Sequence, residues 1–334
     1  MSASCTGSPT AHEAVLALQG STGEVLADVT DPKNPKTICK ITGNWAPTLV
    51  TQRMISWAAT QHYGSSGPSA LVTLDLFSGA TALIANWTGG MFMDGLHAWS
   101  PDESAIAYVT SSTSAVNLHL LSGGGDRVIA TYGTVPGHGF NPDEDSGYLG
   151  FSADGKYLAL VQTFTSGGAA HLQIRNTKDG TLAYSQAAGT MATWSSTGSS
   201  LYFREPNQTF IKSWSPSGGV SQLFALQQAW IAPVSSAGDT YTAYTVRDTS
   251  GLPHVWIYGY NGHAGGELGN VRANPRFLTA TSIFIEEEAS CAPNCGPGPP
   301  TTPDGKYFVY DLATQTETAS KTTLVYSSWP RVGQ

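Results

Sequence analysis

Acidic side chains gather between two apolar runs in the segment 132–150. Asp143, Glu144 and Asp145 follow one another there, and His138 precedes them. Hard cations such as Ca²⁺ take several carboxylate oxygens, so Asp143 and Asp145 are candidate metal ligands. The alternative is a solvated loop in which the same side chains cap the backbone. Ca²⁺ is therefore the one cofactor that the sequence suggests, and all four residues are candidates for ligand binding.

Glu286 opens a run of three glutamates at the start of the Pro/Gly-rich segment 286–306. In a strand, alternate side chains point to opposite faces, so at most two of the three share one side. A solvated surface is the ordinary outcome for such a run, and a ligand-binding role for Glu286 is the alternative.

Further candidates lie where shorter segments lead into apolar runs. They are Trp45, Asp94, His97, Trp230, Arg272 and Arg276. The two tryptophans either stack a sugar or aromatic ligand or are buried in the core. His97 either faces a central channel or is a packing, hydrogen-bonded residue. No G-x-S-x-G, H-E-x-x-H or G-x-x-x-x-G-K-[ST] motif occurs, so the sequence does not decide whether the protein is an enzyme.

Four cysteines are present, at positions 5, 39, 291 and 295. Cys291 and Cys295 form the obvious local pair, which leaves Cys5 with Cys39. A zinc site is the rival interpretation, but one C-x₃-C pair alone is a weak ligand set. We expect two disulfides and hence an oxidising compartment, either extracellular or in the cell envelope.

The composition excludes several classes of protein. The 334 residues carry 16 Lys+Arg against 24 Asp+Glu, a net charge of −8, and only 12% are charged. Nucleic-acid binding depends on clustered basic residues and is not expected. No run of 18 apolar residues predicts a transmembrane helix. Residues 1–12 are expected to be flexible, with a membrane tether upstream, or a lipid on Cys5, as the alternative to free secretion.

A repeat organises the rest of the chain, residues 13–334, into one domain. Each copy is a hydrophobic residue, a Ser-rich turn with Asp or Gly, and alternating apolar residues. Clear copies begin at Trp99, Phe151, Trp194 and Val234, and weaker ones at Leu49 and Phe277, spaced 40 to 52 residues apart. Hairpins follow at 71–84, 117–129, 172–184, 255–268 and 307–319. This period is typical of the four-stranded blades of an all-β propeller.

The chain ends complete the count of blades. Three strands are expected before the first full blade, at 14–20, 24–29 and 36–41, and one after the last, at 322–328. Pairing of the N- and C-terminal strands then closes a ring of seven blades and removes the exposed sheet edge. Six blades is the alternative, because the run 302–306 also resembles a turn between strands.

The turns Ser100-Pro-Asp-Glu and Ser152-Ala-Asp-Gly-Lys, followed by alternating apolar residues, resemble the TolB-like (PD40) branch of WD40-like propellers. The resemblance covers about residues 40–315 by repetition. It implies the propeller fold and a habit of binding other proteins, and it implies no reaction.

Propeller connectivity puts the long insertions 132–150 and 286–306 on one face, opposite the short regular turns. We therefore expect a monomeric, secreted or surface-tethered scaffold that binds a protein or glycan through this long-loop face. The alternative is a divalent-metal-dependent hydrolase of the lactonase or phosphotriesterase type, with its site at the mouth of the central channel.

Overall fold

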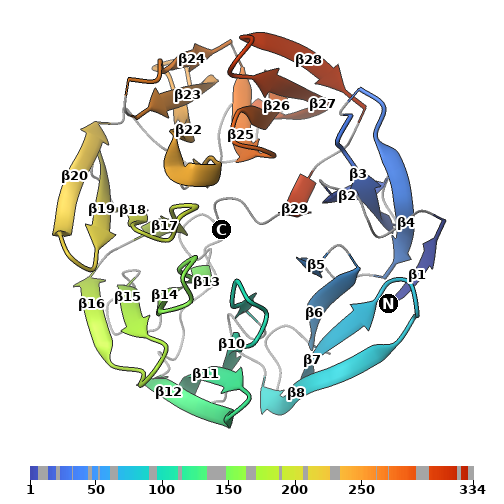
Figure 1. Ribbon diagram of the computed structural model, residues 1–334, viewed down its shortest axis with the longest axis vertical. Helices are drawn as coiled ribbons and strands as arrows, with labels where there is room; N and C mark the ends of the chain where they lie inside the picture. Colours follow the sequence, from blue (N-terminus) through green and yellow to red (C-terminus); the bar gives the residue numbers. More distant parts are fainter. Residues whose placement is uncertain are drawn as a thin grey trace.

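Alternating apolar and polar residues form strands throughout the chain, and the strands build a closed ring of seven sheets in the computed structural model (Figure 1). The structure describes residues 1–6, 14–19, 23–31, 33–43, 47–51, 53–60, 67–89, 96–111, 115–133, 148–162, 171–187, 190–205, 210–225, 234–260, 262–269, 271–290, 301–321 and 325–329. These residues contain no α-helix, only the 3-10 turn η1 (Ala237–Asp239). Within this part of the chain, no helix is long and apolar enough to cross a membrane.

Six blades each consist of four consecutive antiparallel strands, and the first strand of each lies nearest the axis (Figure 1). Blades 1 to 3 are β5 (Thr48–Thr51), β6 (Met54–Thr60), β7 (Gly67–Asp75), β8 (Thr81–Gly89); β9 (His97–Trp99), β10 (Ile106–Ser111), β11 (Ala115–Ser122), β12 (Gly125–Gly133); and β13 (Tyr148–Phe151), β14 (Tyr157–Gln162), β15 (His171–Asn176), β16 (Leu182–Ala187). Blades 4 to 6 are β17 (Thr190–Trp194), β18 (Leu201–Arg204), β19 (Phe210–Ser215), β20 (Gly219–Ala225); β21 (Val234–Ser235), β22 (Tyr241–Arg247), β23 (Pro253–Gly259), β24 (Gly266–Leu268); and β25 (Arg272–Phe277), β26 (Ser282–Ser290), β27 (Thr301–Asp311), β28 (Thr316–Ser320).

The seventh blade joins the two ends of the chain. Its order from the axis is β29 (Val325–Trp329), β2 (Ala14–Gln19), β3 (Gly23–Asp28), β4 (Lys36–Thr42) and β1 (Ser2–Cys5). Ala14 lies opposite Trp329 in the closing pair β2–β29. Seven blades and closure by the terminal strands are thus confirmed. The run 302–306, which suggested six blades, lies within β27 instead.

The fifth strand of this blade comes from the segment 1–12, of which residues 2–5 form β1. Cys5 lies directly opposite Cys39, and the two form the expected disulfide. A sulfur held in a disulfide cannot carry a lipid, so the alternative of lipid attachment at Cys5 is wrong. Residues 7–13 lie outside the described residues, so the domain boundary at residue 12 stays a prediction. Cys291 and Cys295 lie outside them too.

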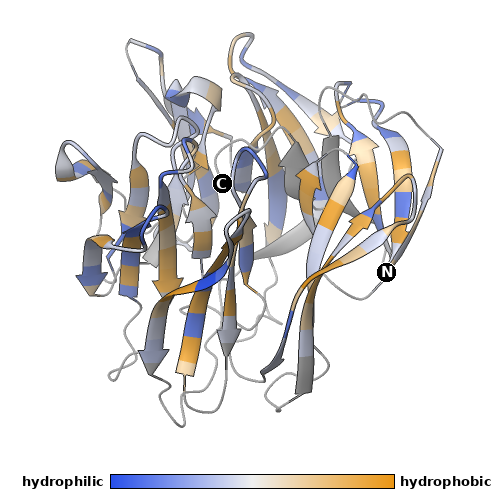
Figure 2. Ribbon diagram, turned by 60° about the horizontal axis from the view of Figure 1, so that its bottom comes forward, coloured by the Kyte–Doolittle hydropathy of each residue, from blue (hydrophilic) through white to orange (hydrophobic). Residues whose placement is uncertain are grey.

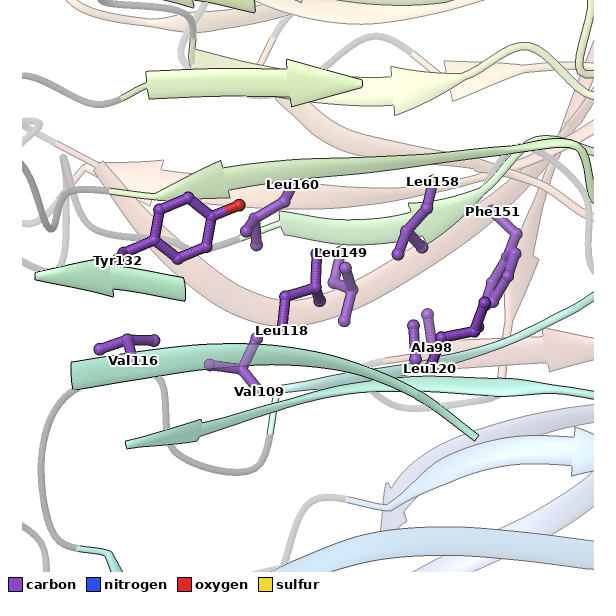
Figure 3. Close-up of a cluster of buried hydrophobic side chains, with 11 residues drawn as sticks. Ala98, Val109, Val116, Leu118, Leu120, Tyr132, Leu149, Phe151, Leu158 and Leu160 are labelled. Carbon is purple, nitrogen blue, oxygen red and sulfur yellow. The ribbon is translucent and has the colours of Figure 1, made fainter. Parts of the chain in front are cut away.

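Apolar side chains fill the space between every pair of adjacent blades. Seven buried clusters occur, one for each junction, including that between blades 7 and 1. Figure 3 shows the junction of blades 2 and 3, where Leu118 and Leu120 of β11 face Leu149, Leu158 and Leu160. Colouring by hydropathy shows the same apolar bands along the strands, with polar turns at their ends (Figure 2). Burial of this surface, at about 25 cal/mol per Å² of apolar area, is the main force that closes the ring.

The regular turn between the first and second strands of a blade is built around one buried serine. Its hydroxyl accepts the backbone N–H five residues later, and the residue three positions on adopts positive φ. The serines are Ser100, Ser152, Ser195 and Ser236, and the positive-φ residues are Glu103, Gly155, Gly198 and Asp239. The Ser-x-Asp/Gly pattern of the sequence is therefore a structural signal. Its side chains are consumed by the turn itself.

Ser152→Ala is expected to lower the free energy of unfolding by about 1–3 kcal/mol, because it leaves the buried N–H of Tyr157 without its acceptor. The Ser152 hydroxyl lies 3.0 Å from that nitrogen and also donates to Asp154 at 2.7 Å. Urea unfolding measures the loss. Ser104→Ala, an exposed serine of the neighbouring turn, is the matched control and should stay within about 0.5 kcal/mol. Equal effects of the two changes would contradict this account of the turn.

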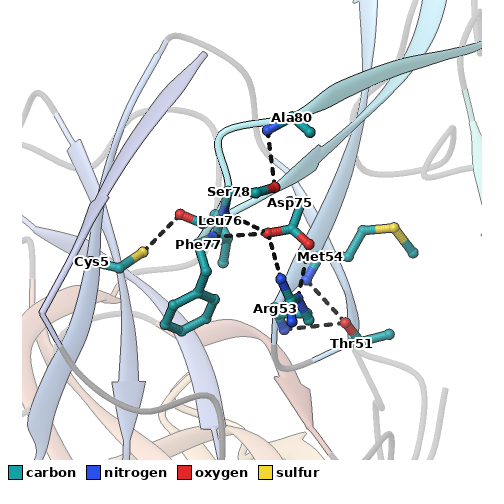
Figure 4. A network of polar contacts seen from close by, with 9 residues as sticks. All are labelled: Cys5, Thr51, Arg53, Met54, Asp75, Leu76, Phe77, Ser78 and Ala80. Carbon is teal, nitrogen blue, oxygen red and sulfur yellow. Dashed lines mark hydrogen bonds and ion pairs between the residues drawn. The ribbon is translucent and has the colours of Figure 1, made fainter.

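Turns on this face also hold the two hairpins of a blade together. In blade 1, Arg53 donates from Nε and Nη2 to the carboxylate of Asp75, at 2.8 and 3.1 Å (Figure 4). The Asp75 carboxylate also accepts the backbone N–H groups of Phe77 and Ser78. The Arg53 hydrogen bond, with these N–H groups, holds the pKa of Asp75 well below its usual range. The Cys5 sulfur lies 3.0 Å from the Leu76 carbonyl oxygen, and because this sulfur belongs to a disulfide the contact is not a hydrogen bond.

Candidate functional site

One charged side chain is exposed on the lining of the ring. Among the described side chains of the innermost strands β5, β9, β13, β17, β21 and β25, only Arg276 is exposed. Neighbouring blades cover both faces of each sheet, so an exposed side chain in the middle of an innermost strand faces the axis. The candidate site is built around this residue.

The strand that carries Arg276 is irregular. Ala273 pairs with Glu286 and Arg276 with Phe284, so an advance of three positions on β25 matches two on β26, and Asn274 and Pro275 form a bulge. Asn274 has a φ of 52°, a left-handed conformation that Asn tolerates better than most residues. Proline lacks an N–H and is confined to edge strands or bulges, and an innermost strand is such an edge. The sequence Arg-Ala-Asn-Pro-Arg therefore produces a local kink, the usual way to re-aim side chains beside a site.

Asn274 ties this kink to two other strands. Its backbone N–H donates to the Thr245 hydroxyl of β22 at 3.0 Å. Its side-chain amide donates to the carboxyl group of Glu286 on β26. The bulge thus connects blade 5, the innermost strand of blade 6 and the acidic end of β26.

Glu286 is a buried acid, with 2% of its surface exposed. Burial and the charge of the neighbouring Glu288 raise its pKa to about 7, although Arg276 acts in the opposite direction. A carboxyl group with this pKa takes up and releases a proton near neutral pH, which is what general acid–base chemistry needs. Perturbed acids of this kind are also a mark of functional sites. The expectation that the glutamate run is a solvated surface is wrong for Glu286 and for Glu288, which is 5% exposed.

Glu288 is neutralised by an ion pair across the junction of blades 5 and 6. Arg247 Nη2 lies 2.9 and 3.1 Å from its two carboxylate oxygens. Arg247 Nη1 donates to the Gly251 carbonyl at 2.9 Å, and both partners of the ion pair are buried. Because Arg247 is engaged by Glu288, Arg276 is the cation whose charge acts on Glu286.

Blades 4, 5 and 6 carry a polar residue at one position of the second strand where blades 2 and 3 carry a buried valine. Val109 and Val161, in the second strands of blades 2 and 3, are buried in the clusters that face the next blade. The equivalent position in each blade lies three residues after the residue that pairs with the end of the innermost strand. In blades 4, 5 and 6 this position is occupied by Arg204, Thr245 and Glu286. We call these three residues the polar sector. Polar groups at core positions cost stability and are retained mainly where they serve a function.

The structure separates the sequence candidates that it describes. Glu286 and Arg276 lie on the paired strands β26 and β25 and influence each other's charge, whereas Arg272 points to Glu287 and Glu317 and stacks over the Phe308 ring, 4.1 Å from its centroid. His97 lies at another place in the ring. Its Nε2 is 2.8 Å from the buried Ser56 hydroxyl, to which the Trp99 indole also donates.

The remaining candidates lie outside the described residues: Trp45, Asp94, His138, Asp143, Glu144, Asp145 and Trp230. The described part of the chain holds no group of three or more His, Cys, Asp or Glu side chains arranged for a metal ion. The Ca²⁺ site at Asp143 and Asp145 therefore stays a prediction.

Sequence reasoning missed Arg204, Arg247 and Asn274. Two signals point to them. The second strands of blades 2 and 3 stay apolar where Leu-Tyr-Phe-Arg204 ends in a charge. Asn-Pro within an inner-strand run marks a bulge.

Comparison with known proteins shows the fold. No protein-family profile and no curated protein sequence matches the chain. Among solved structures, TolB from Acinetobacter baumannii is similar with a TM-score of 0.50 and 15% identity, over 79% of this chain and 65% of TolB. This chain therefore spans less than two thirds of the length of that protein. A protein of Bacteroides fragilis described as a candidate 6-phosphogluconolactonase is similar with a TM-score of 0.55 and 11% identity, over 97% and 99% of the chains.

The propeller domain of the Trilobed protease from Pyrococcus furiosus gives an informative contrast. It is similar with a TM-score of 0.52 and 12% identity, over 80% of this chain and 82% of that one, and it is described as having an open velcro topology. Here β2 and β29 pair and close the ring. At these identities the similarities establish a β-propeller and do not transfer a function.

Proposed function

We propose that the protein is a binding scaffold that holds a protein or glycan partner on its long-loop face. The observation that carries the proposal is the position of four strand ends. One long insertion follows Gly133 and ends before Tyr148, and the other follows Ser290 and ends before Thr301. The order of the strands puts these four strand ends on the same face. Loops concentrated on one face of a rigid ring are the usual place for binding residues.

The opposite face supports the same conclusion. Its turn serines and aspartates are engaged in hydrogen bonds of the turns, as at Ser100 with Asp102 and Ser152 with Asp154. Side chains already satisfied within a turn have little left for a ligand. The resemblance to TolB-like repeats, with its habit of protein binding, points the same way. We further propose a site outside the cytosol, because the disulfide Cys5–Cys39 fits an oxidising compartment.

A double variant of the long-loop face tests the proposal. Partners captured on the wild-type chain from a cell-surface extract, and glycans bound on an array, would be purified and their Kd values measured. Asp143→Asn combined with Asp145→Asn should weaken binding, and a role in binding rather than in folding predicts a stability change under about 0.5 kcal/mol. Asp179→Asn, an exposed turn residue of the opposite face, is the matched control. An unchanged Kd, or a much lower melting temperature with binding intact, would refute the proposal.

The same preparation separates the scaffold from the alternative, a divalent-metal-dependent hydrolase. Elemental analysis and melting before and after EDTA distinguish the two. Stoichiometric metal together with a lower melting temperature in EDTA favours the hydrolase, since a bound ion stabilises the folded state by mass action.

A further inference from the structure

Arg276 differs from three other arginines because it forms no ion pair with any residue that the structure describes. Arg53, Arg247 and Arg272 each form an ion pair with a carboxylate. Arg276 makes no ion pair or hydrogen bond with any residue that the structure describes, and its nearest charged influence is Glu286. It is nevertheless the exposed cation on the ring lining, in a protein of net charge −8.

The surroundings of Arg276 leave a positive charge uncompensated. Arg276 is exposed, and the protein packed around part of its side chain lowers its pKa. Glu288 is already bound by Arg247, and Glu286, with its raised pKa, carries a proton for part of the time at neutral pH. An anion that reaches Arg276 therefore gains a strong partner at a place where no described residue forms an ion pair with the guanidinium.

The guanidinium group also sets the shape of that anion. It presents planar, paired donors, which match a carboxylate in a bidentate arrangement. Glu286 is 2% exposed and acts on the anion through its charge: the ionised form repels an anion and the protonated form does not.

We propose that Arg276 binds a carboxylate group of the ligand at the axis of the propeller. This inference rests on the proposed binding function and deepens it by naming the chemistry of one recognised group. The carboxylate comes either from an acidic sugar or from the C-terminus of a peptide, and the experiment distinguishes these sources.

Arginine-selective labelling tests the proposal on the full chain. Phenylglyoxal modification, followed by peptide mapping, gives a separate rate for each arginine. Arg276 should react at least about fivefold faster than the ion-paired Arg247 and Arg272, because paired guanidinium groups are blocked. The added probes are digalacturonate and its methyl ester, and trialanine and its C-terminal amide. Arg53, which lies on the turn face, is the matched control for non-specific protection.

Protection of Arg276 by one free carboxylate, but not by its ester or amide, supports the proposal and identifies the source. In Arg276→Gln, binding of that probe measured by calorimetry should be lost, with the melting temperature unchanged. The proposal is overturned if Arg276 reacts no faster than its paired counterparts, if neither acid protects it, or if the neutral analogues protect equally. The Asp143→Asn/Asp145→Asn variant should retain the protection, so failure of the long-loop proposal and failure of this one are distinguishable.

Discussion

Replacing Glu288 with Gln is expected to lower the free energy of unfolding by about 3–5 kcal/mol, the usual effect of leaving one buried charge without its partner. Glu288 and Arg247 are 5% and 7% exposed, and the pair joins blades 5 and 6. The neutral amide cannot repay the desolvation of the guanidinium. Urea unfolding at pH 7.5, with the slope checked for constancy, measures the change.

Two control variants give this result its meaning. Arg53→Gln breaks the ion pair with Asp75 on the turn face, where the side chain of Arg53 is 50% exposed, and should cost far less. The double variant Arg247→Met with Glu288→Leu removes both charges at once. It should recover much of the loss, because a packed apolar pair often replaces a buried ion pair without penalty. If Glu288→Gln costs no more than Arg53→Gln, the pair does not lock the blades together.

Much of the fold could be predicted because the ring repeats one unit. Each buried turn serine, such as Ser152, accepts the same backbone N–H and is followed by the same apolar alternation, so the signal recurs with every blade. The closing strands 14–19 and 325–329 followed from counting four strands to a blade. Strand β1 could not be predicted in the same way. Four small residues, Ser-Ala-Ser-Cys, are too short and too weakly apolar to predict a strand, and their place depends on pairing with β4.

The glutamate run shows where pattern reasoning failed. Alternation alone gives the relative side of Glu286, Glu287 and Glu288, but not whether a side faces water. The answer depends on Arg247 and Asn274, which come from other strands and are far away in sequence. A charge in a strand is read as exposed unless its partner is known, and that partner is fixed only by the order of blades. The hairpin β19–β20 was also missed, since its turn resembles the Ser-rich turns between first and second strands.

The buried carboxyl of Glu286 should make stability depend on pH in the opposite sense to an ordinary ion-paired acid. Its pKa is about 7 in the folded protein, against 4.5 for the free side chain. Between these values the unfolded chain has released the proton while the folded protein still holds it. Stability from this group is therefore full below pH 4.5, falls as pH rises to about 7 and then levels off, with a total loss of at most about 3 kcal/mol.

Glu286→Gln isolates this contribution, because the amide resembles the protonated acid at every pH. Relative to the wild type, the variant should gain up to about 3 kcal/mol between pH 4.5 and pH 8, as the wild type alone loses stability. Urea unfolding at pH 4.5, 6, 7 and 8 gives the difference, in which other carboxylates cancel. Titration of the wild-type carboxyl by NMR should show a midpoint of about 7 and does not depend on the variant folding. A difference that stays constant with pH, together with a midpoint near 4.5, would mean that Arg276 and Asn274 keep Glu286 ionised, and the uncompensated charge at the axis would disappear.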